Sequence, residues 1–187
     1  MRTAVIYAHP YDKSFNHAIL ETLKEALASR GEEYDVIDLY ADKFDPTYHP
    51  EELALFSEGK YLDPLIEKYH SILLAASRVV LIFPIWWSDM PAILKGFFDK
   101  TMLPGFGYKV VDGKMAPGLT GVSQTLIFTT SEAPTAAFAP YFNDYFIHNS
   151  LDAIGMNNAS WHNCPAITSP DPAMRKAFLA SIPSLLQ

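Results

Sequence analysis

The sequence has a single cysteine, Cys164, among its 187 residues, so the chain cannot form an internal disulfide. Long apolar runs are also missing, because none approaches the ~20 residues that a membrane span requires. The first residues enter a strand-like pattern at Thr3 and show no charged region followed by a cleavage site, as a secretory signal would. We therefore expect a soluble, cytoplasmic protein with no membrane span.

Basic residues are scarce: 14 Lys and Arg stand against 21 Asp and Glu, which gives a formal net charge of −7. No cluster of Lys and Arg is present to neutralise a phosphate backbone, so we expect no nucleic-acid partner. A small phosphorylated ligand needs only local donors and stays compatible with this charge. The length and the ordinary composition, without internal repeats, predict a single domain over residues 1–187.

Short, almost continuous apolar runs predict strands that are buried on both faces of a parallel sheet. The expected strands are residues 3–8, 34–39, 79–83, 124–129 and 159–164. Helical patterns lie between them, at residues 14–30, after 51, after 63, at 91–100, at 141–153 and after 172. This order predicts an α/β fold: a flavodoxin-like, doubly wound, five-stranded parallel sheet in the order 2-1-3-4-5 with helices on both faces.

The loop after the first strand, residues 9–16, contains no glycine and therefore fits neither a P-loop nor a dinucleotide-binding turn. It does place Ser14, Asn16 and free backbone N–H groups at the start of a helix, an arrangement that suits an anion. His9, at the tip of the strand, adds a donor that can become cationic beside a phosphate. The same residues also fit an ordinary helix cap next to a loop histidine, and both interpretations stay open.

The loop after the third strand, residues 83–91, carries two adjacent tryptophans, Trp86 and Trp87. Two neighbouring indoles cannot both point into one core layer, so at least one must line a cleft or an interface. A flat aromatic surface beside main-chain amides suits a planar heterocycle. A contact with a partner protein would use tryptophan in the same way, and the two interpretations are compatible.

The loop after the fourth strand begins with Thr129 and Thr130, whose small hydroxyl groups can approach the edge of a ring. Taken alone, this loop also reads as a generic turn. In the order 2-1-3-4-5, however, the carboxyl ends of strands one, three and four form one continuous rim. The three loops are therefore expected to converge on one ligand site.

The chain resembles the NAD(P)H:quinone reductase family of flavodoxin-like oxidoreductases. The resemblance rests on His9 with Ser14-Phe15-Asn16, on Phe83 to Trp87, on Met90 to Asp99, on Gly105 to Tyr108, and on Thr129-Thr130. It extends to the fifth strand and is weak in the last helix. It implies an enzyme that transfers two electrons from NAD(P)H, through a bound FMN or FAD, to quinones or to azo or nitro compounds in a ping-pong reaction.

The resemblance also implies roles for particular positions. The expected flavin contacts are His9, Ser14, Phe15, Asn16, Pro84, Ile85, Trp86, Trp87, Thr129, Thr130 and Ser131. Phe106 and Tyr108 match aromatic residues that reach the active site of the second subunit of a homodimer. The family's tyrosine and histidine beside the flavin have no clear counterpart in this chain. Tyr141, Tyr145 and His148 are candidates for them, and Tyr108 or His148 could donate a proton to a reduced quinone.

This chain departs from the family at Ser131-Glu132, where well-known members have two glycines. A carboxylate there would disfavour an anionic reduced flavin unless it points away or is paired. Two alternatives share the fold: a flavodoxin-type electron carrier, and an ancillary flavoprotein subunit that regulates a membrane transporter.

Overall fold

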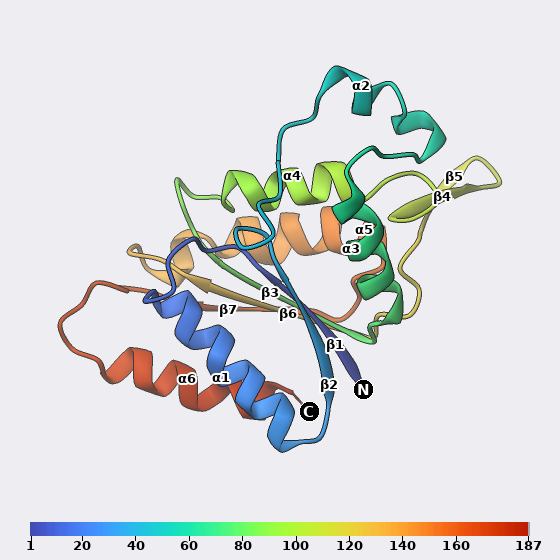
Figure 1. The fold of residues 1–187 in the computed structure, drawn as a ribbon. Helices are drawn as coiled ribbons and strands as arrows, with labels where there is room; N and C mark the ends of the chain where they lie inside the picture. The colour runs from blue at the N-terminus through green and yellow to red at the C-terminus, as the bar shows by residue number, and fades with distance from the viewer. Residues whose placement is uncertain (187) are drawn as a thin grey trace.

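The structure, a computed structural model, describes residues 1–186 and contains one five-stranded parallel sheet between two layers of helices (Figure 1). The strands are β1 (Arg2–Tyr7), β2 (Glu33–Asp38), β3 (Arg78–Pro84), β6 (Gln124–Thr130) and β7 (Ala159–Cys164). They lie in the order β2-β1-β3-β6-β7, and every neighbouring pair is parallel. Because β4 and β5 form a separate ribbon, this order is the predicted 2-1-3-4-5, and the fold prediction is confirmed.

Helices cover both faces of the sheet. One face packs on α1 (Phe15–Ser29) and α6 (Ala173–Leu185), and the other packs on α3 (Pro64–Ala75), α4 (Ala92–Thr101) and the π-helix η3 (Pro140–Leu151) (Figure 1). Alternate strand residues point to opposite faces. Val80 accordingly packs on the α1 side, whereas Leu81 packs on the α4 side.

The long connection from β2 to α3 contains the short helix α2 (Pro50–Leu53) and a single 3-10 turn, η1 (Phe56–Glu58). Lys100 of α4, which is 4% exposed, binds this connection to the body of the fold. The ammonium group donates to the carbonyl oxygens of Asp45 (3.0 Å) and Thr47 (3.2 Å) and pairs with Glu52 at 2.9 Å. A buried charge is tolerated only when it is paired in this way.

Two segments differ from the sequence prediction. Residues 108–117 form a hairpin of β4 (Tyr108–Val111) and β5 (Lys114–Pro117), which was not predicted from the sequence. Its turn is Asp112-Gly113, a pair that is common in hairpin turns. The expected helix at 141–153 is mostly π-helical and ends in the short α5 (Asp152–Ile154). A 3-10 turn, η2 (Thr135–Ala137), precedes it. Within residues 1–186, no helix combines the length and the apolarity needed to cross a membrane.

Candidate functional site

The amino terminus of α1 lies at the carboxyl edge of the sheet, directly after β1. Ser14 caps the helix: its backbone is extended, and its hydroxyl oxygen accepts a hydrogen bond from the His17 N–H at 3.1 Å. The first turn of a helix leaves N–H groups without intrahelical acceptors, and the helix dipole adds partial positive charge there. This end of α1 is therefore suited to an anion such as a phosphate.

Asn16, in the first turn of α1, carries a buried polar atom that has no partner. Its side chain is 3% exposed, and its amide nitrogen donates to the Thr130 hydroxyl at 2.9 Å. The other side-chain atom, Oδ1, is buried and accepts no hydrogen bond from residues 1–186. An unsatisfied buried acceptor costs about 1–3 kcal/mol. Asn16 is one of the residues that line a cavity, so this unpartnered oxygen lies beside the space that a ligand would fill.

His9 and Trp86 face each other at the same cavity, with ring centroids 5.9 Å apart and planes tilted by 58°. The His9 Nδ1 accepts a hydrogen bond from the Tyr11 N–H at 3.1 Å, which places the remaining ring proton on Nε2. Burial lowers the pKa of His9. The imidazole is therefore a neutral donor, and a bound phosphate would act in the opposite direction by favouring the cation that the sequence suggested.

The segment after β3 forms the second wall. The Ile85 N–H donates to the Thr130 carbonyl oxygen at 2.8 Å, so pairing with β6 continues one residue beyond Pro84. Trp86 and Asp89 then close a two-residue turn through N–H donors on both residues, at 2.9 and 3.1 Å. This turn leaves Trp86 partly exposed beside the cavity and directs the chain into α4.

The two central residues of that turn, Trp87 and Ser88, both have left-handed backbones, with φ of 51° and 66°. Hairpin turns of this shape usually carry Asn-Gly, because other residues are strained there. Each such residue costs about 1–3 kcal/mol. The Trp87 side chain is fully exposed, so the strain is not offset by packing within the described chain.

The far wall comes from two connections. Ser131 follows β6, and its N–H donates to the carbonyl oxygen of Cys164, at the end of β7. The Glu132 carboxylate is paired, as its position near a reduced flavin would require. Its Oε1 accepts a hydrogen bond from the Thr168 N–H at 2.9 Å. Ile167 adds an apolar side chain that sequence reasoning missed, since no motif marks the connection after β7.

Together these groups enclose a cavity of about 220 Å³. Its lining consists of His9, Ser14, Phe15, Asn16, Pro84, Ile85, Trp86, Thr130, Ser131, Glu132 and Ile167. The structure thus brings together all of the expected flavin contacts except Trp87 and Thr129.

Thr129 lies outside the cavity because neighbouring strand residues face opposite sides of the sheet. Its hydroxyl accepts from the Trp161 indole N–H at 2.8 Å and donates to Asn163 at 2.9 Å, on the side away from α1. The threonine pair therefore has divided roles. Thr130 belongs to the site, and Thr129 ties β6 to β7.

The aromatic and proton-transfer candidates also lie away from this cavity. Phe106 is 9% exposed and stacks on His70 of its own chain, with centroids 3.4 Å apart. Tyr108 begins the β4–β5 hairpin, and His148 pairs on the surface with Asp152 at 3.0 Å. None of Tyr108, Tyr141 and His148 lines the cavity.

A family model described as "Flavodoxin-like fold" matches residues 1–182. The chain belongs to this family. The resemblance inferred from the motifs is confirmed, and the remaining comparisons extend it to named flavodoxin-like oxidoreductases.

An uncharacterized NAD(P)H oxidoreductase of Haemophilus influenzae is 29% identical over 185 residues, which cover 96% of this chain and 91% of that protein. NAD(P)H dehydrogenase [quinone] 1 of Cavia porcellus is 36% identical over 123 residues, 57% of this chain but only 45% of the relative. The structure of an NAD(P)H:quinone oxidoreductase from Methanothermobacter marburgensis superposes with a TM-score of 0.89, covering 98% and 96% of the two chains, at 23% identity.

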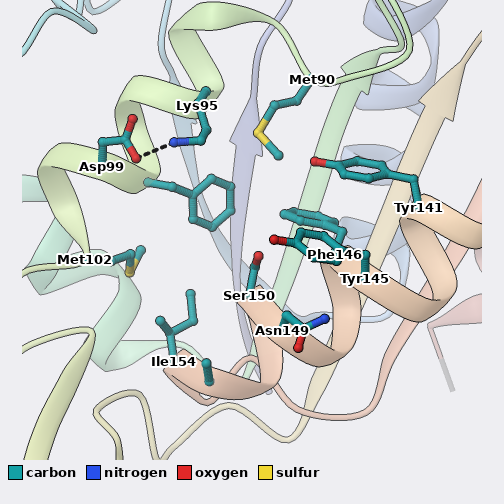
Figure 2. A pocket seen from close by; sticks show the side chains of 12 residues that line it. Met90, Lys95, Asp99, Met102, Tyr141, Tyr145, Phe146, Asn149, Ser150 and Ile154 are labelled. Atoms are coloured by element: carbon teal, nitrogen blue, oxygen red, sulfur yellow. Dashed lines mark hydrogen bonds and ion pairs between the residues drawn. The ribbon is translucent and has the colours of Figure 1, made fainter. Parts of the chain in front are cut away.

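This flavodoxin-like chain has a second, larger cavity of about 340 Å³ between α4 and the π-helix η3 (Figure 2). Its lining is Met90, Lys95, Phe98, Asp99, Met102, Tyr141, Tyr145, Phe146, Asn149, Ser150, Ala153 and Ile154. Figure 2 shows the Tyr141 ring projecting from η3 toward Met90. The Tyr141 hydroxyl donates to Asp89 at 2.8 Å and so connects this cavity to the strained turn.

Proposed function

We propose that the chain binds a flavin, FMN or FAD, in the 220 Å³ cavity and acts in the cytoplasm as an NAD(P)H oxidoreductase that reduces quinones, or azo or nitro compounds. The observation that carries the proposal is the combination, in one cavity, of a helix amino terminus, an unsatisfied buried oxygen on Asn16, and the partly exposed indole of Trp86. A phosphorylated, polyhydroxylated aromatic ligand satisfies all three. The oxidoreductase relatives support the same class.

The residues present fit such a ligand. The first turn of α1, with the Ser14 cap, would hold the phosphate, and the neutral His9 would supply a further N–H donor. Asn16 Oδ1 would accept from a ligand hydroxyl or N–H. Pro84, Ile85 and Trp86 would form the apolar wall against the ring system.

When bound, a flavin supplies two-electron transfer between a nicotinamide and an acceptor, and the protein contributes binding, orientation and electrostatics. The main-chain donors near the ring are fewer than the sequence suggested, because the Trp86 N–H is committed to the Asp89 carbonyl oxygen. The Trp87 N–H makes no hydrogen bond within residues 1–186, but Trp87 lies outside the cavity lining, so we assign it no contact with the ring. Glu132 keeps its carboxylate turned to the Thr168 N–H, which limits its repulsion of such charge.

We also propose that two copies form a homodimer through the β4–β5 hairpin. This ribbon projects from the body of the fold (Figure 1), and Val110, Val111 and Met115 on it are 68%, 49% and 61% exposed. Exposed apolar side chains gathered on one ribbon mark an interaction surface. A second copy would cover this ribbon and would bring Tyr108 into the interface.

Steady-state oxidation of NADH and NADPH by the purified protein, with and without a water-soluble quinone, tests the function. We expect quinone-dependent turnover with ping-pong kinetics. A flavodoxin-type carrier would bind flavin yet fail to oxidise either nicotinamide, and this result would overturn the enzymatic part of the proposal. If neither flavin binding nor turnover is found, the whole proposal fails.

A further inference from the structure

The strained turn at Trp87 and Ser88 is held by a side chain from a distant part of the sequence. Asp89, which closes the turn, accepts two hydrogen bonds on its Oδ1 atom: one from the Tyr141 hydroxyl at 2.8 Å and one from the Met90 N–H at 2.7 Å. Tyr141 belongs to the first turn of η3 and lies 52 residues away in the sequence. The turn after β3 is therefore joined to a different element through the Asp89 side chain.

Tyr141 is itself fixed in place. Its ring stacks on Tyr145 and Phe146 of the same helix, with interplanar angles of 19° and 12°, and meets Phe142 edge-on at 5.0 Å. These three ring contacts hold the Tyr141 side chain to its own helix. The turn is therefore anchored to a rigid aromatic cluster.

The Tyr141 hydroxyl donates to Asp89 and holds its own proton firmly. Burial, and then the hydrogen bond to Asp89, raise the pKa of Tyr141 well above its ordinary value. The phenol therefore keeps its proton throughout the physiological range, and that proton is committed to Asp89. This geometry argues against the role of proton donor that the sequence suggested for Tyr141.

The turn has no evident use inside the chain. An Asn-Gly pair would close it with less strain, whereas Trp87 adopts a left-handed backbone and places its indole entirely in solvent. Trp86, the preceding residue, lines the cavity that we assign to the flavin. A strained, exposed indole next to such a cavity is placed to meet a planar aromatic molecule that arrives from solution.

We propose that Tyr141, acting through Asp89, is a positioning residue that fixes the Trp86–Asp89 turn and thereby sets how the site accepts a planar electron acceptor. The inference rests on the proposed oxidoreductase function. It assigns the selection of the acceptor to a contact between η3 and the loop after β3, and it requires no chemistry from Tyr141 itself.

The first test replaces Tyr141 with Phe, which keeps the stacked ring and removes only the hydroxyl. The matched control is Tyr61→Phe, since the Tyr61 hydroxyl also binds a carboxylate, that of Glu67, on a part of the surface away from both cavities. A lost charge-assisted hydrogen bond corresponds to about a tenfold change in an equilibrium. We expect Y141F to raise the KM for the quinone by about this factor. The rate constant for reduction of the flavin by NAD(P)H and the number of flavins bound per chain should stay unchanged. Y61F should alter none of these three quantities.

Two further variants separate positioning from a general loss of structure. Asp89→Asn keeps an accepting oxygen but removes its charge, so we expect it to raise the quinone KM, by less than Y141F does. Ser88→Gly, placed in the Y141F background, removes the strain at one left-handed position. We expect it to lower the raised quinone KM part of the way back to the wild-type value. A merely structural defect would lower kcat and the melting temperature together and would not be rescued in this way.

Hydrogen exchange tests the same coupling without any activity. The N–H groups of Trp86 and Asp89 close the turn, and we expect both to exchange faster in Y141F than in Y61F, whether or not flavin is present. Faster exchange in a chain that binds no flavin would support the coupling while the proposed function fails. Equal exchange in the two variants, or faster exchange with an unchanged quinone KM, overturns the inference.

Discussion

The side-chain amide of Asn16 donates a hydrogen bond to the hydroxyl of Thr130 at 2.9 Å, and so ties the first turn of α1 to the carboxyl end of β6. This contact joins two of the three loops that form the cavity. It also fixes the orientation of the amide, because it turns the unpartnered Oδ1 away from Thr130. The affinity of the site for a ligand should therefore respond to changes at Asn16.

We expect Asn16→Ala to weaken flavin binding by tenfold or more, about 1.4 kcal/mol, while the free energy of unfolding of the apoprotein changes by less than about 1 kcal/mol. The substitution removes one hydrogen bond, but it also removes an unsatisfied buried acceptor, and the two effects on the apoprotein oppose each other. Flavin titration followed by fluorescence, together with urea unfolding, measures both quantities. Asn157→Ala, which removes a side-chain hydrogen bond from an exposed asparagine to the Val122 carbonyl oxygen, away from the cavity, is the control.

An apoprotein destabilised by several kcal/mol, with an unchanged flavin affinity, would show that Asn16 serves only the fold. In that case the unpartnered oxygen would have no bearing on the ligand.

Arg78, at the amino end of β3, is 1% exposed and should matter for stability but not for turnover. It pairs with Glu32 at 2.6 Å and donates to the Leu186 carbonyl oxygen at 3.0 Å. We expect Arg78→Met to cost about 3 kcal/mol, the lower end for breaking a buried pair, because Arg30 still neutralises Glu32. Arg2→Met, which removes exposed ion pairs, should cost less than about 1 kcal/mol in urea unfolding.

Both variants should keep the kcat and KM of the wild type at 25 °C, since the amino ends of the strands lie opposite the cavity. A large loss of kcat in Arg78→Met, at a temperature where the variant is folded, would contradict this division of the sheet.

The acid limb of the stability curve should depend on Asp45. A hydrogen bond from His49, at 2.9 Å, and then one from the Thr47 N–H lower the pKa of Asp45 to about 2. The unfolded chain binds more protons than the folded chain between this pKa and the ordinary aspartate pKa of 3.8. The contribution of Asp45 to stability is therefore present above pH 4 and is lost as the pH falls toward 2. Asp45→Asn should therefore flatten the loss of melting temperature across that window, and an unchanged slope would contradict the prediction.

The hairpin should control association. Val110 and Met115 are cross-strand partners in the β4–β5 ribbon. The double substitution Val110→Lys with Met115→Glu keeps an attractive pair within the ribbon and removes its apolar surface. In sedimentation velocity we expect the wild type to be a dimer, the double variant to be a monomer, and the control Met174→Lys, on the opposite helix α6, to stay a dimer. A wild type that is monomeric at micromolar concentration contradicts the proposed interface.

Much of the fold could be predicted because its signals are local. Apolar runs such as Val79 to Phe83 predict buried parallel strands, and the Asp63-Pro64 pair marks the start of α3. The hairpin at residues 108–117 was not predicted, although Asp112-Gly113 is a pair typical of hairpin turns. The sequence pattern predicted a helix at residues 141–153 but not its π-helical form.

The sequence predicted which loops form the site, but not which side of the sheet each of their residues faces. Thr129 and Thr130 looked equivalent in the sequence, and the strand pleat separates them. The Tyr141–Asp89 contact was not foreseen, since a hydrogen bond between residues 52 positions apart leaves no trace in a single sequence. Ile167 was missed for the same reason.

The most direct test of the central claim is the absorbance spectrum of the purified protein, followed by mass analysis of the fraction released by heat. The account predicts the yellow colour of an oxidised flavin, a stoichiometry near one flavin per chain, and a released mass equal to FMN or FAD. A colourless protein that takes up neither FMN nor FAD when they are added would contradict it.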